Sequence, residues 1–336
     1  MLSASFISTL IGTKMPGAGA LWYSQTITFL QPVWIGDEIR VVGTISKKSE
    51  SQRSFIIKIE IYNQNNQLVI TGESQVKVPV VKDYQKVDDP ILSNGVIIVI
   101  GGTGGIGESI IERLLSNGKR LIFTYLKNNN LATDIVKKHS SKIEKYCLDI
   151  CDEVAIKNFI NYTITKYERI DSLINCATDR IINNSFEKLT WESIDKQINI
   201  HLKSVFCLAK QVIPHFLKNK YGKIVNISSI YSDATPPLNL YDYVIAKSAL
   251  CAFTKGLALE YGPYGININI VSPSMTETSL IAAIPEKTKL LTMMQTPLRR
   301  LARPEDIAGA VAFLISEEFS FITGETIRIN GGQLML

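Results

Sequence analysis

Apolar and polar positions follow two different patterns along the chain, one up to residue 82 and another from residue 94. The first part opens with an apolar stretch, residues 2–11, that predicts a helix stopping at Gly12. Alternating stretches that are typical of strands follow at residues 25–29, 38–46, 53–62 and 68–78. A helix before an antiparallel sheet predicts a small α+β domain over residues 1–82.

The second part alternates short apolar runs with helical stretches. The runs that predict strands cover residues 96–100, 120–125, 145–148, 172–175, 222–227, 266–272 and 326–329. Strands alternating with helices indicate a parallel sheet covered on both faces, which is a doubly wound, Rossmann-type α/β fold. We expect this domain to span residues 94–336, after a polar linker at 83–93 that contains Pro90.

Composition narrows the class of protein. The 336 residues are 46% apolar and 20% charged, with a net charge of +5 spread over short basic pairs, so we expect no nucleic-acid partner. No apolar run is long enough to span a membrane, and no basic residue precedes the first apolar stretch as in a signal peptide. Five cysteines without metal-ligand spacing predict a reduced, cytoplasmic chain with no metal site.

A glycine-rich turn, Gly101 to Gly107, lies between the strand at 96–100 and the next helical stretch. Glycines there allow the backbone to approach a pyrophosphate, and the helix start offers free N–H groups and a partial positive charge. The position after a buried strand therefore predicts a dinucleotide site, with Thr103 and Ile106 inside the turn.

Tyr243 and Lys247 are four residues apart in a helical stretch and share one face. A nearby ammonium stabilises a phenolate, so we expect Lys247 to lower the pKa of Tyr243 and to make it an acid–base catalyst. Tyr162 and Lys166 have the same spacing, on a polar helix with no other candidate residue beside them. That second pair therefore carries no functional hypothesis.

These motifs resemble the short-chain dehydrogenase/reductase family over residues 93–336, close to its 3-oxoacyl carrier-protein reductase branch. The glycine pattern matches at Gly101, Gly105 and Gly107, with Ile100 where the family has threonine. Thr178 and Ser274 replace family glycines, which leaves the shape of their loops open. The resemblance implies further cofactor contacts at Asp149, Asn175, Ala177, Pro273 and Thr278, besides Tyr243 and Lys247.

The resemblance also implies catalytic roles. Ser229 precedes Tyr243 by 14 residues, about the family spacing, and would hold the substrate oxygen. Tyr243 would donate the proton while the nicotinamide delivers hydride, and Lys247 would hold the nicotinamide ribose. His201 stands where the family has a proton-relay asparagine. It could relay a proton or be a packed interface histidine, and the sequence favours neither.

Cofactor preference follows from the end of the second strand of this domain. An acidic side chain there would bind the ribose hydroxyls of NAD(H), but residues 124–130 contain none, and Lys127 is present instead. We therefore expect NADP(H) as the preferred cofactor, with NAD(H) as the alternative.

Related enoyl reductases place tyrosine seven positions before lysine, whereas Tyr241 is six before Lys247 and lies on the wrong helix face. Carbonyl reduction is therefore favoured over double-bond reduction.

Residues 1 to about 80 resemble the C-terminal portion of a MaoC-like hot-dog domain, the fold of enoyl-CoA hydratases. The matching segments are residues 1–5, 12–19, 24–25, Phe29, 32–33 and 36–37. The family's catalytic Asp and His would lie upstream of Met1, and no histidine occurs before His139. We expect a partial hot-dog region that pairs with another chain or packs on the reductase domain.

Together these observations predict an NADPH-dependent oxidoreductase that reduces a carbonyl to a secondary alcohol. The expected substrate is a 3-oxoacyl thioester on acyl carrier protein or CoA, in fatty acid biosynthesis, and the expected assembly is a homodimer or homotetramer. Two alternatives stay open: part of a bifunctional hydratase–dehydrogenase that needs an upstream segment, and a non-catalytic cofactor-binding protein.

Overall fold

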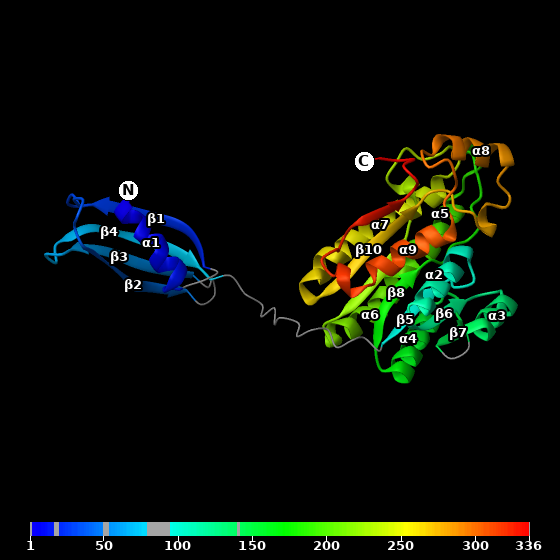
Figure 1. The fold of residues 1–336 in the computed structure, drawn as a ribbon, viewed down its shortest axis with the longest axis horizontal. Coiled ribbons are helices and arrows are strands. Elements are labelled where there is room, and N and C mark those ends of the chain that lie inside the picture. The colour runs from blue at the N-terminus through cyan, green and yellow to red at the C-terminus, as the bar shows by residue number, and fades with distance from the viewer. Residues whose placement is uncertain (1, 17–19, 50–53, 79–94, 140–141, 336) are drawn as a thin grey trace. The chain divides into compact units, whose positions relative to one another are not determined.

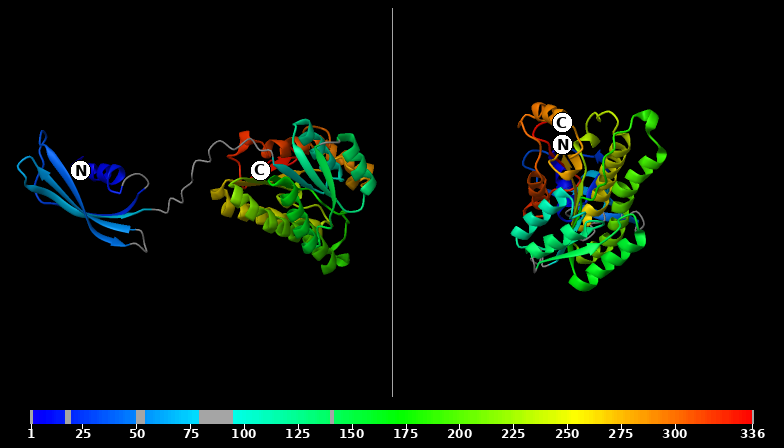
Figure 2. Two further views of the ribbon diagram at one scale, coloured as in Figure 1. Left: turned by 90° about the horizontal axis from the view of Figure 1, so that it is seen from below. Right: turned by 90° about the vertical axis from the view of Figure 1, so that its right-hand side faces the viewer.

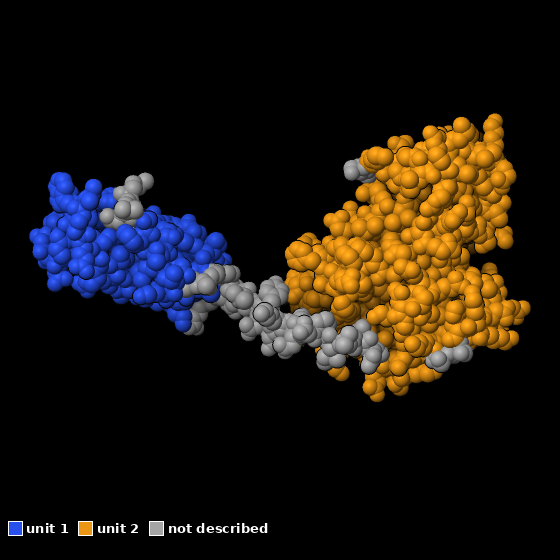
Figure 3. All heavy atoms as spheres, viewed as in Figure 1, with its two compact units in different colours: residues 1–84 blue, residues 85–336 orange. Residues whose placement is uncertain are grey.

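A computed structural model of the chain describes residues 2–16, 20–49, 54–78, 95–139 and 142–335. The chain divides into two compact units, Met1–Tyr84 and Gln85–Leu336 (Figure 3). The expected linker at 83–93 lies outside the described residues, as does the segment 17–19 of the hot-dog resemblance. Each unit is therefore considered by itself.

Unit 1 is one helix on a four-stranded antiparallel sheet, in the strand order β1-β4-β3-β2 (Figure 1). Its elements are α1 (Leu2–Thr13), β1 (Leu21–Phe29), β2 (Ile39–Ser49), β3 (Ser54–Asn63) and β4 (Leu68–Lys77). Ile7 and Ile11 of α1 are buried against Ile57, Ile59 and Ile61 of β3 and the neighbouring strands. The helix continues past Gly12 to Thr13, so the prediction that it stops at Gly12 was wrong, because one glycine near a helix end costs only about 1 kcal/mol.

Unit 2 contains a seven-stranded sheet in the order β11-β10-β9-β8-β5-β6-β7, and every neighbouring pair is parallel. This confirms the predicted Rossmann-type α/β fold. The strands are β5 (Val96–Ile100), β6 (Arg120–Tyr125), β7 (Ile143–Cys147), β8 (Ile170–Asn175), β9 (Gly222–Ile227), β10 (Ile266–Pro273) and β11 (Thr326–Ile329).

Helices cover both faces of this sheet, as the two views of Figure 2 show. They are α2 (Gly105–Ser116), α3 (Asn129–His139), α4 (Glu153–Tyr167), α5 (Trp191–Ile198), α6 (Ser204–Asn219), α7 (Tyr241–Tyr261), α8 (Glu286–Gln295) and α9 (Pro304–Leu314). Alternate residues of β5 point to opposite faces, so Ile98 joins the core under α4 and α6 while Val99 joins the core under α2, α3 and α9. All five residues of β5 are buried, which places this strand at the centre of the unit.

No helix within the described ranges combines the length and the apolar character that crossing a membrane requires.

Candidate active site

The strand order reverses at β5, because the chain builds β6 and β7 on one side of it and β8 to β11 on the other. In open parallel sheets, ligands bind beyond the carboxyl ends of the strands at such a reversal. The glycine-rich turn follows β5, and Asn175 ends the neighbouring strand β8. Ser229 follows β9, and Thr278 follows β10. The fold therefore brings the predicted cofactor and catalytic residues to one edge of the sheet.

The glycine-rich turn needs its glycines for close backbone contacts. Gly101 has a φ of +81°, and a Cβ on it would lie 2.7 Å from the Cα of Ala177. A Cβ on Gly107 would lie 2.3 Å from the carbonyl oxygen of Gly101. The N–H of Gly102 donates to the Thr124 carbonyl at 2.8 Å, which ties the turn to β6. Side chains at these positions would displace the backbone that a dinucleotide approaches.

The turn leads into α2 at a helix start that suits an anion. Gly104 is the N-cap and provides no side-chain acceptor for the first N–H groups of α2. Thr103 and Ile106 are half-buried beside it. Thr278 lies against the turn from the other side, since a Cβ on Gly105 would be 2.8 Å from its Cγ2. These residues fit the pyrophosphate of a dinucleotide.

The predicted adenosine contacts lie beyond β6 and β7. Lys127 is exposed in the loop between β6 and α3, and Asp149 follows β7 and accepts a hydrogen bond from the Cys151 N–H at 2.8 Å. Burial opposes ionisation of Asp179, but a hydrogen bond from Lys196 and, more weakly, the charge of Lys127 lower its pKa. Lys127 therefore lies within electrostatic reach of the loop that follows β8.

Tyr243 and Lys247 lie on α7, and both side chains are buried. The Lys247 ammonium donates to the Ile227 carbonyl at the end of β9 at 2.8 Å, and its Nζ is 5.8 Å from the centre of the Tyr243 ring. Ser229, two residues beyond Ile227, has extended backbone and caps the short 3-10 helix Ile230–Ser232. The structure thus places the three predicted catalytic residues together.

Burial has the largest effect on the pKa values of Tyr243 and Lys247. It raises the pKa of Tyr243 to about 12, while a hydrogen bond with Ser229 acts in the opposite direction. Burial lowers the pKa of Lys247 to about 8. The prediction that the pKa of Tyr243 would be lowered was therefore wrong, because the loss of hydration outweighs the hydrogen bond with Ser229. At neutral pH Tyr243 carries its proton and Lys247 is mostly charged.

His201 lies in the π-helical turn Asn199–Lys203, between α5 and α6. Such turns widen a helix locally and are frequent at functional sites. The imidazole is buried within the unit and contacts the ring of Tyr243. Burial, together with the charge of Lys247, lowers its pKa well below the usual value, so the ring is neutral at pH 7. One ring nitrogen is then a donor and the other an acceptor.

A small cavity adjoins His201. It has a volume of about 10 Å³ and is lined by Asn175, His201, Ser204 and Lys247 together with apolar side chains. The Nε2 atom of His201 and the Oδ1 atom of Asn175 are buried and have no hydrogen-bond partner among the described residues. The cavity is near the minimum size for one water molecule, and two polar atoms beside it lack partners.

Sequence reasoning missed a row of buried polar side chains behind this cavity. The amide of Asn175 donates to the Oδ1 atom of Asn226 at 2.6 Å, and the amide of Asn226 donates to the Thr254 hydroxyl at 2.9 Å. Thr254 in turn donates to the Leu250 carbonyl. Asn226, which interrupts the apolar run Ile224 to Ile227 of β9, was the available signal. The row fixes the orientation of Asn175 beside the site.

The second Tyr-x-x-x-Lys pair forms a separate cluster. Glu144 of β7 accepts hydrogen bonds from Tyr162 and Tyr167 and pairs with Lys166 at 2.8 Å. The expectation that no other candidate residue lies beside Tyr162 and Lys166 was wrong, because the turns of α4 bring this strand residue to them. Here the lysine charge is neutralised by a carboxylate, so the pair is a surface ion-pair network.

The two positions where glycine is replaced adopt ordinary backbone geometry. Neither Thr178 nor Ser274 is among the described residues with positive φ. Ser274 follows the buried Pro273, and its N–H donates to the Ile329 carbonyl at 3.1 Å, which continues the pairing of β10 with β11. Larger side chains at these positions therefore require no left-handed backbone.

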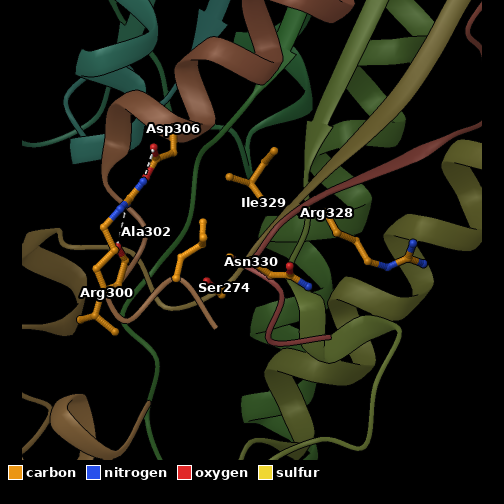
Figure 4. A pocket seen from close by; sticks show the side chains of 10 residues that line it. Ser274, Arg300, Ala302, Asp306, Arg328, Ile329 and Asn330 are labelled. Atoms are coloured by element: carbon orange, nitrogen blue, oxygen red, sulfur yellow. Dashed lines mark hydrogen bonds and ion pairs between the residues drawn. The ribbon is translucent and has the colours of Figure 1, made fainter. Parts of the chain in front are cut away.

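A hollow of about 320 Å³ lies between Ser274 and the end of β11 (Figure 4). Arg300 and Asp306 point toward each other at its rim and form a bidentate ion pair. The Nη1 and Nη2 atoms of Arg300 lie 2.5 and 2.9 Å from the Oδ2 and Oδ1 atoms of Asp306. Arg328 points away from Ser274 in this view and pairs with Asp233 at 3.1 Å. A second hollow, of about 500 Å³, lies under the segment from Glu277 to Met293. Both adjoin the segment that carries Thr278.

Comparison with known proteins places this site in a family. The family model described as "Enoyl-(Acyl carrier protein) reductase" matches residues 101–333, which is more than half of the chain. A curated relative, 3-oxoacyl-(acyl-carrier-protein) reductase of Thermotoga maritima, is 31% identical over 247 residues, or 72% of this chain and 98% of the relative. The chain belongs to the short-chain dehydrogenase/reductase family. It is an NAD(P)-dependent oxidoreductase of that family.

Solved structures of similar proteins agree with this assignment. The structure titled "ElxO with NADP Bound" is 27% identical, with a TM-score of 0.67, and the match covers 71% of this chain and 98% of that one. Levodione reductase is 25% identical, with a TM-score of 0.68, and the match covers 72% and 98%. The family model begins its match at residue 101, so the family assignment concerns unit 2.

Proposed function

We propose that this short-chain dehydrogenase/reductase uses NADPH to reduce a 3-oxoacyl thioester, carried by CoA or acyl carrier protein, to the 3-hydroxyacyl thioester. The observation that carries the proposal is the group Ser229, Tyr243 and Lys247 beside the glycine-rich turn. The likeness to a 3-oxoacyl-(acyl-carrier-protein) reductase supports the substrate class. The resemblance of unit 1 to part of a hot-dog domain supports an acyl thioester as well.

The raised pKa of Tyr243 suits reduction, because its phenol keeps the proton that the carbonyl oxygen must receive. When bound, NADPH supplies the hydride that goes to the carbonyl carbon. Ser229 holds the carbonyl oxygen by a hydrogen bond. Lys247 holds a positive charge below the Tyr243 ring and stabilises the phenolate as the proton leaves.

We propose the relay role for His201, rather than interface packing alone. Its buried Nε2 and the Oδ1 atom of Asn175 both lack hydrogen-bond partners in the part of the chain that the structure describes, and Lys247 lines the same cavity. One water there would satisfy both atoms and connect His201 to the lysine. Such a chain would return a proton to Tyr243 after each turnover.

The NADPH preference rests on charge at the end of β6. Lys127 is exposed there, and the first turn of α3 contains no acidic residue. A carboxylate at this place would repel a 2′-phosphate, whereas an ammonium would attract it. The NADP bound to the similar protein ElxO supports the same preference.

Carbonyl reduction is preferred over the double-bond reduction named by the family model. Tyr241 is half-exposed at the start of α7 and packs against Phe186, whereas Tyr243 is buried beside Lys247. The tyrosine of the site is therefore the one four residues before the lysine.

We further propose that the chain forms a homo-oligomer through α6 and α7. Phe206 of α6 contacts Phe253 of α7, with ring centroids 6.1 Å apart, and Phe206 and Ile245 remain more than 40% exposed. Exposed apolar side chains on two adjacent helices favour burial against a second copy.

The test is oxidation of NADPH and of NADH in the presence of acetoacetyl-CoA, with Tyr243→Phe as the variant and Tyr162→Phe as its matched control. We expect turnover with NADPH that falls about 10³-fold in Tyr243→Phe and is unchanged in Tyr162→Phe. Binding of NADPH without turnover of any 3-oxoacyl thioester would contradict the proposed substrate.

A further inference from the structure

Ser229 lies at one end of a short 3-10 turn, and Asp233 lies at the other end. Ser229 is the N-cap of this turn and Asp233 is its C-cap. The Ser232 N–H donates to the Ser229 carbonyl at 3.0 Å, and the Asp233 N–H donates to the Ile230 carbonyl at 3.1 Å. We call residues 229–233 the serine turn. Because it is a single hydrogen-bonded turn, a displacement of Asp233 also displaces Ser229.

The inner side of the serine turn is bonded to α7, the helix of the proton donor Tyr243. The Ser232 hydroxyl donates to the Ser229 carbonyl at 2.7 Å and accepts from the Cys251 thiol at 3.3 Å. The Ser248 hydroxyl donates to the Ser232 carbonyl at 3.5 Å. Cys251 and Ser248 both lie on α7. These bonds tie the backbone of Ser229 to the helix of the proton donor.

The outer side of the serine turn is held by an ion pair with β11. Arg328 extends from β11 away from Ser274 (Figure 4), and its Nη2 atom lies 3.1 Å from the Oδ2 atom of Asp233. In the sheet β10 lies between β9 and β11, so the pair crosses over β10 to reach the turn that follows β9. The side chain of Asp233 is 12% exposed and that of Arg328 is 30% exposed. The turn is therefore held from both sides, by a helix and by a strand.

The ion pair is close, but it leaves both partners incompletely hydrogen-bonded. Over the described ranges of the chain, the Oδ2 atom of Asp233 and the Nε atom of Arg328 have no hydrogen-bond partner. The charge of Arg328 therefore compensates a mostly buried carboxylate that has little other support. If this charge were removed, the carboxylate would gain free energy by turning toward water, and the serine turn would move with it.

We propose that Asp233 and Arg328 are positioning residues that hold the Ser229 hydroxyl at the substrate oxygen. This inference rests on the role of Ser229 in the proposed carbonyl reduction. Both residues act through the serine turn and need not touch substrate or cofactor. A displacement of a reacting group by about 1 Å can lower a rate about 100-fold, so a small movement of the turn has a measurable effect.

The first experiment measures kcat and KM with NADPH and acetoacetyl-CoA. We expect Arg328→Gln to lower kcat about 10- to 100-fold with little change in the KM for NADPH, because the glycine-rich turn is unaltered. Asp233→Asn added to Arg328→Gln should recover most of kcat, because it removes the uncompensated buried charge. A double variant that is no more active than Arg328→Gln would overturn the inference.

Arg169→Gln is the matched control for the loss of a buried ion pair. Arg169 pairs with Asp171 at 2.7 Å, and their side chains are 26% and 5% exposed, which is close to the burial of the first pair. This pair lies at the amino end of β8, whereas Ser229 follows the carboxyl end of the neighbouring parallel strand β9. We expect Arg169→Gln to lower thermal stability about as much as Arg328→Gln does and to leave kcat unchanged. Equal falls of kcat in the two variants would indicate a general loss of stability and would overturn the inference.

Hydrogen exchange of the backbone tests the ion pair without any turnover. The N–H groups of Ser232 and Asp233 donate within the serine turn, so their exchange reports how firmly the turn is held. We expect exchange in a peptide that covers residues 229–234 to be about fivefold faster in Arg328→Gln and unchanged in Arg169→Gln. This result would support the positioning role even if no 3-oxoacyl thioester is reduced. Unchanged exchange in Arg328→Gln would overturn it.

Discussion

The imidazole of His201 meets the phenol ring of Tyr243 edge-to-face, with the ring centroids 5.7 Å apart and the ring planes at 85°. This contact joins the π-helical turn before α6 to the catalytic face of α7. It also places a neutral, buried imidazole between the proton donor and the small cavity beside Asn175.

His201→Leu removes both ring nitrogens while keeping an apolar side chain in the site. We expect kcat to fall about 10- to 100-fold with little change in KM, because the loss concerns proton return and not substrate binding. His201→Asn restores a polar group and should recover most of kcat. Equal losses of kcat in the two variants, matched by equal losses of thermal stability, would indicate packing alone.

The low pKa of Lys247 predicts the pH dependence of reduction. Below about pH 8 the ammonium beneath Tyr243 is present, and it is lost as the pH rises through that value. We therefore expect kcat to fall above about pH 8 and to show no step near pH 6.5 from His201, whose pKa lies well below that value. A profile of kcat from pH 5 to 10 tests this, and a level profile up to pH 10 would contradict it.

The lowered pKa of Lys247 also affects stability: the free energy of unfolding should rise with pH over the range in which kcat falls. The pKa of Lys247 is about 8 in the folded chain and 10.5 in an ordinary lysine, so the unfolded state binds more protons between these values. The free energy of unfolding should rise across this range by up to about 3 kcal/mol relative to Lys247→Met. Urea unfolding of both proteins at pH 7.5 and pH 10 measures the difference. A constant difference would mean that burial shifts this pKa little.

Lys127→Gln removes the exposed charge at the end of β6. We expect the ratio of kcat/KM for NADPH to that for NADH to fall about tenfold, because a charged hydrogen bond to a phosphate contributes about 1.5 kcal/mol. Lys137→Gln, in the last turn of α3, is the control and should leave the ratio unchanged. A shift of equal size in both variants would indicate a general effect of surface charge.

Phe206→Glu tests the proposed assembly. A charge in a helix–helix contact opposes burial, so we expect the variant to have the monomer mass of 37.4 kDa while the unaltered chain has a multiple of it. Light scattering after gel filtration measures both masses, and Phe321→Glu is the control. A monomeric unaltered chain would rule out the assembly.

The order of strands and helices in unit 2 could be predicted from sequence, because buried parallel strands are short apolar runs and each is followed by a helical pattern. The glycine-rich turn could also be predicted from the sequence. A Cβ at Gly101 or Gly107 would collide with the backbone, so both positions require glycine and the sequence shows it. Element ends were less predictable: β7 covers Ile143–Cys147, whereas 145–148 was expected.

Side-chain contacts between elements that are distant in the sequence could not be predicted. Glu144 reaches Tyr162 and Lys166 only because β7 lies beside α4, and a local spacing contains no such information. The raised pKa of Tyr243 likewise depends on complete burial, which spacing to Lys247 does not reveal. The partner atoms of Asn226 come from two distant elements.

The buried row from Asn175 through Asn226 to Thr254 limits how this site can diverge. Each member donates to the next, so replacing one by an apolar residue leaves its neighbour unsatisfied at a cost of about 1–3 kcal/mol. Single substitutions therefore lower folding stability, while concerted replacement of the row by apolar side chains of similar shape need not. Homologues should keep or lose these three polar residues as a set.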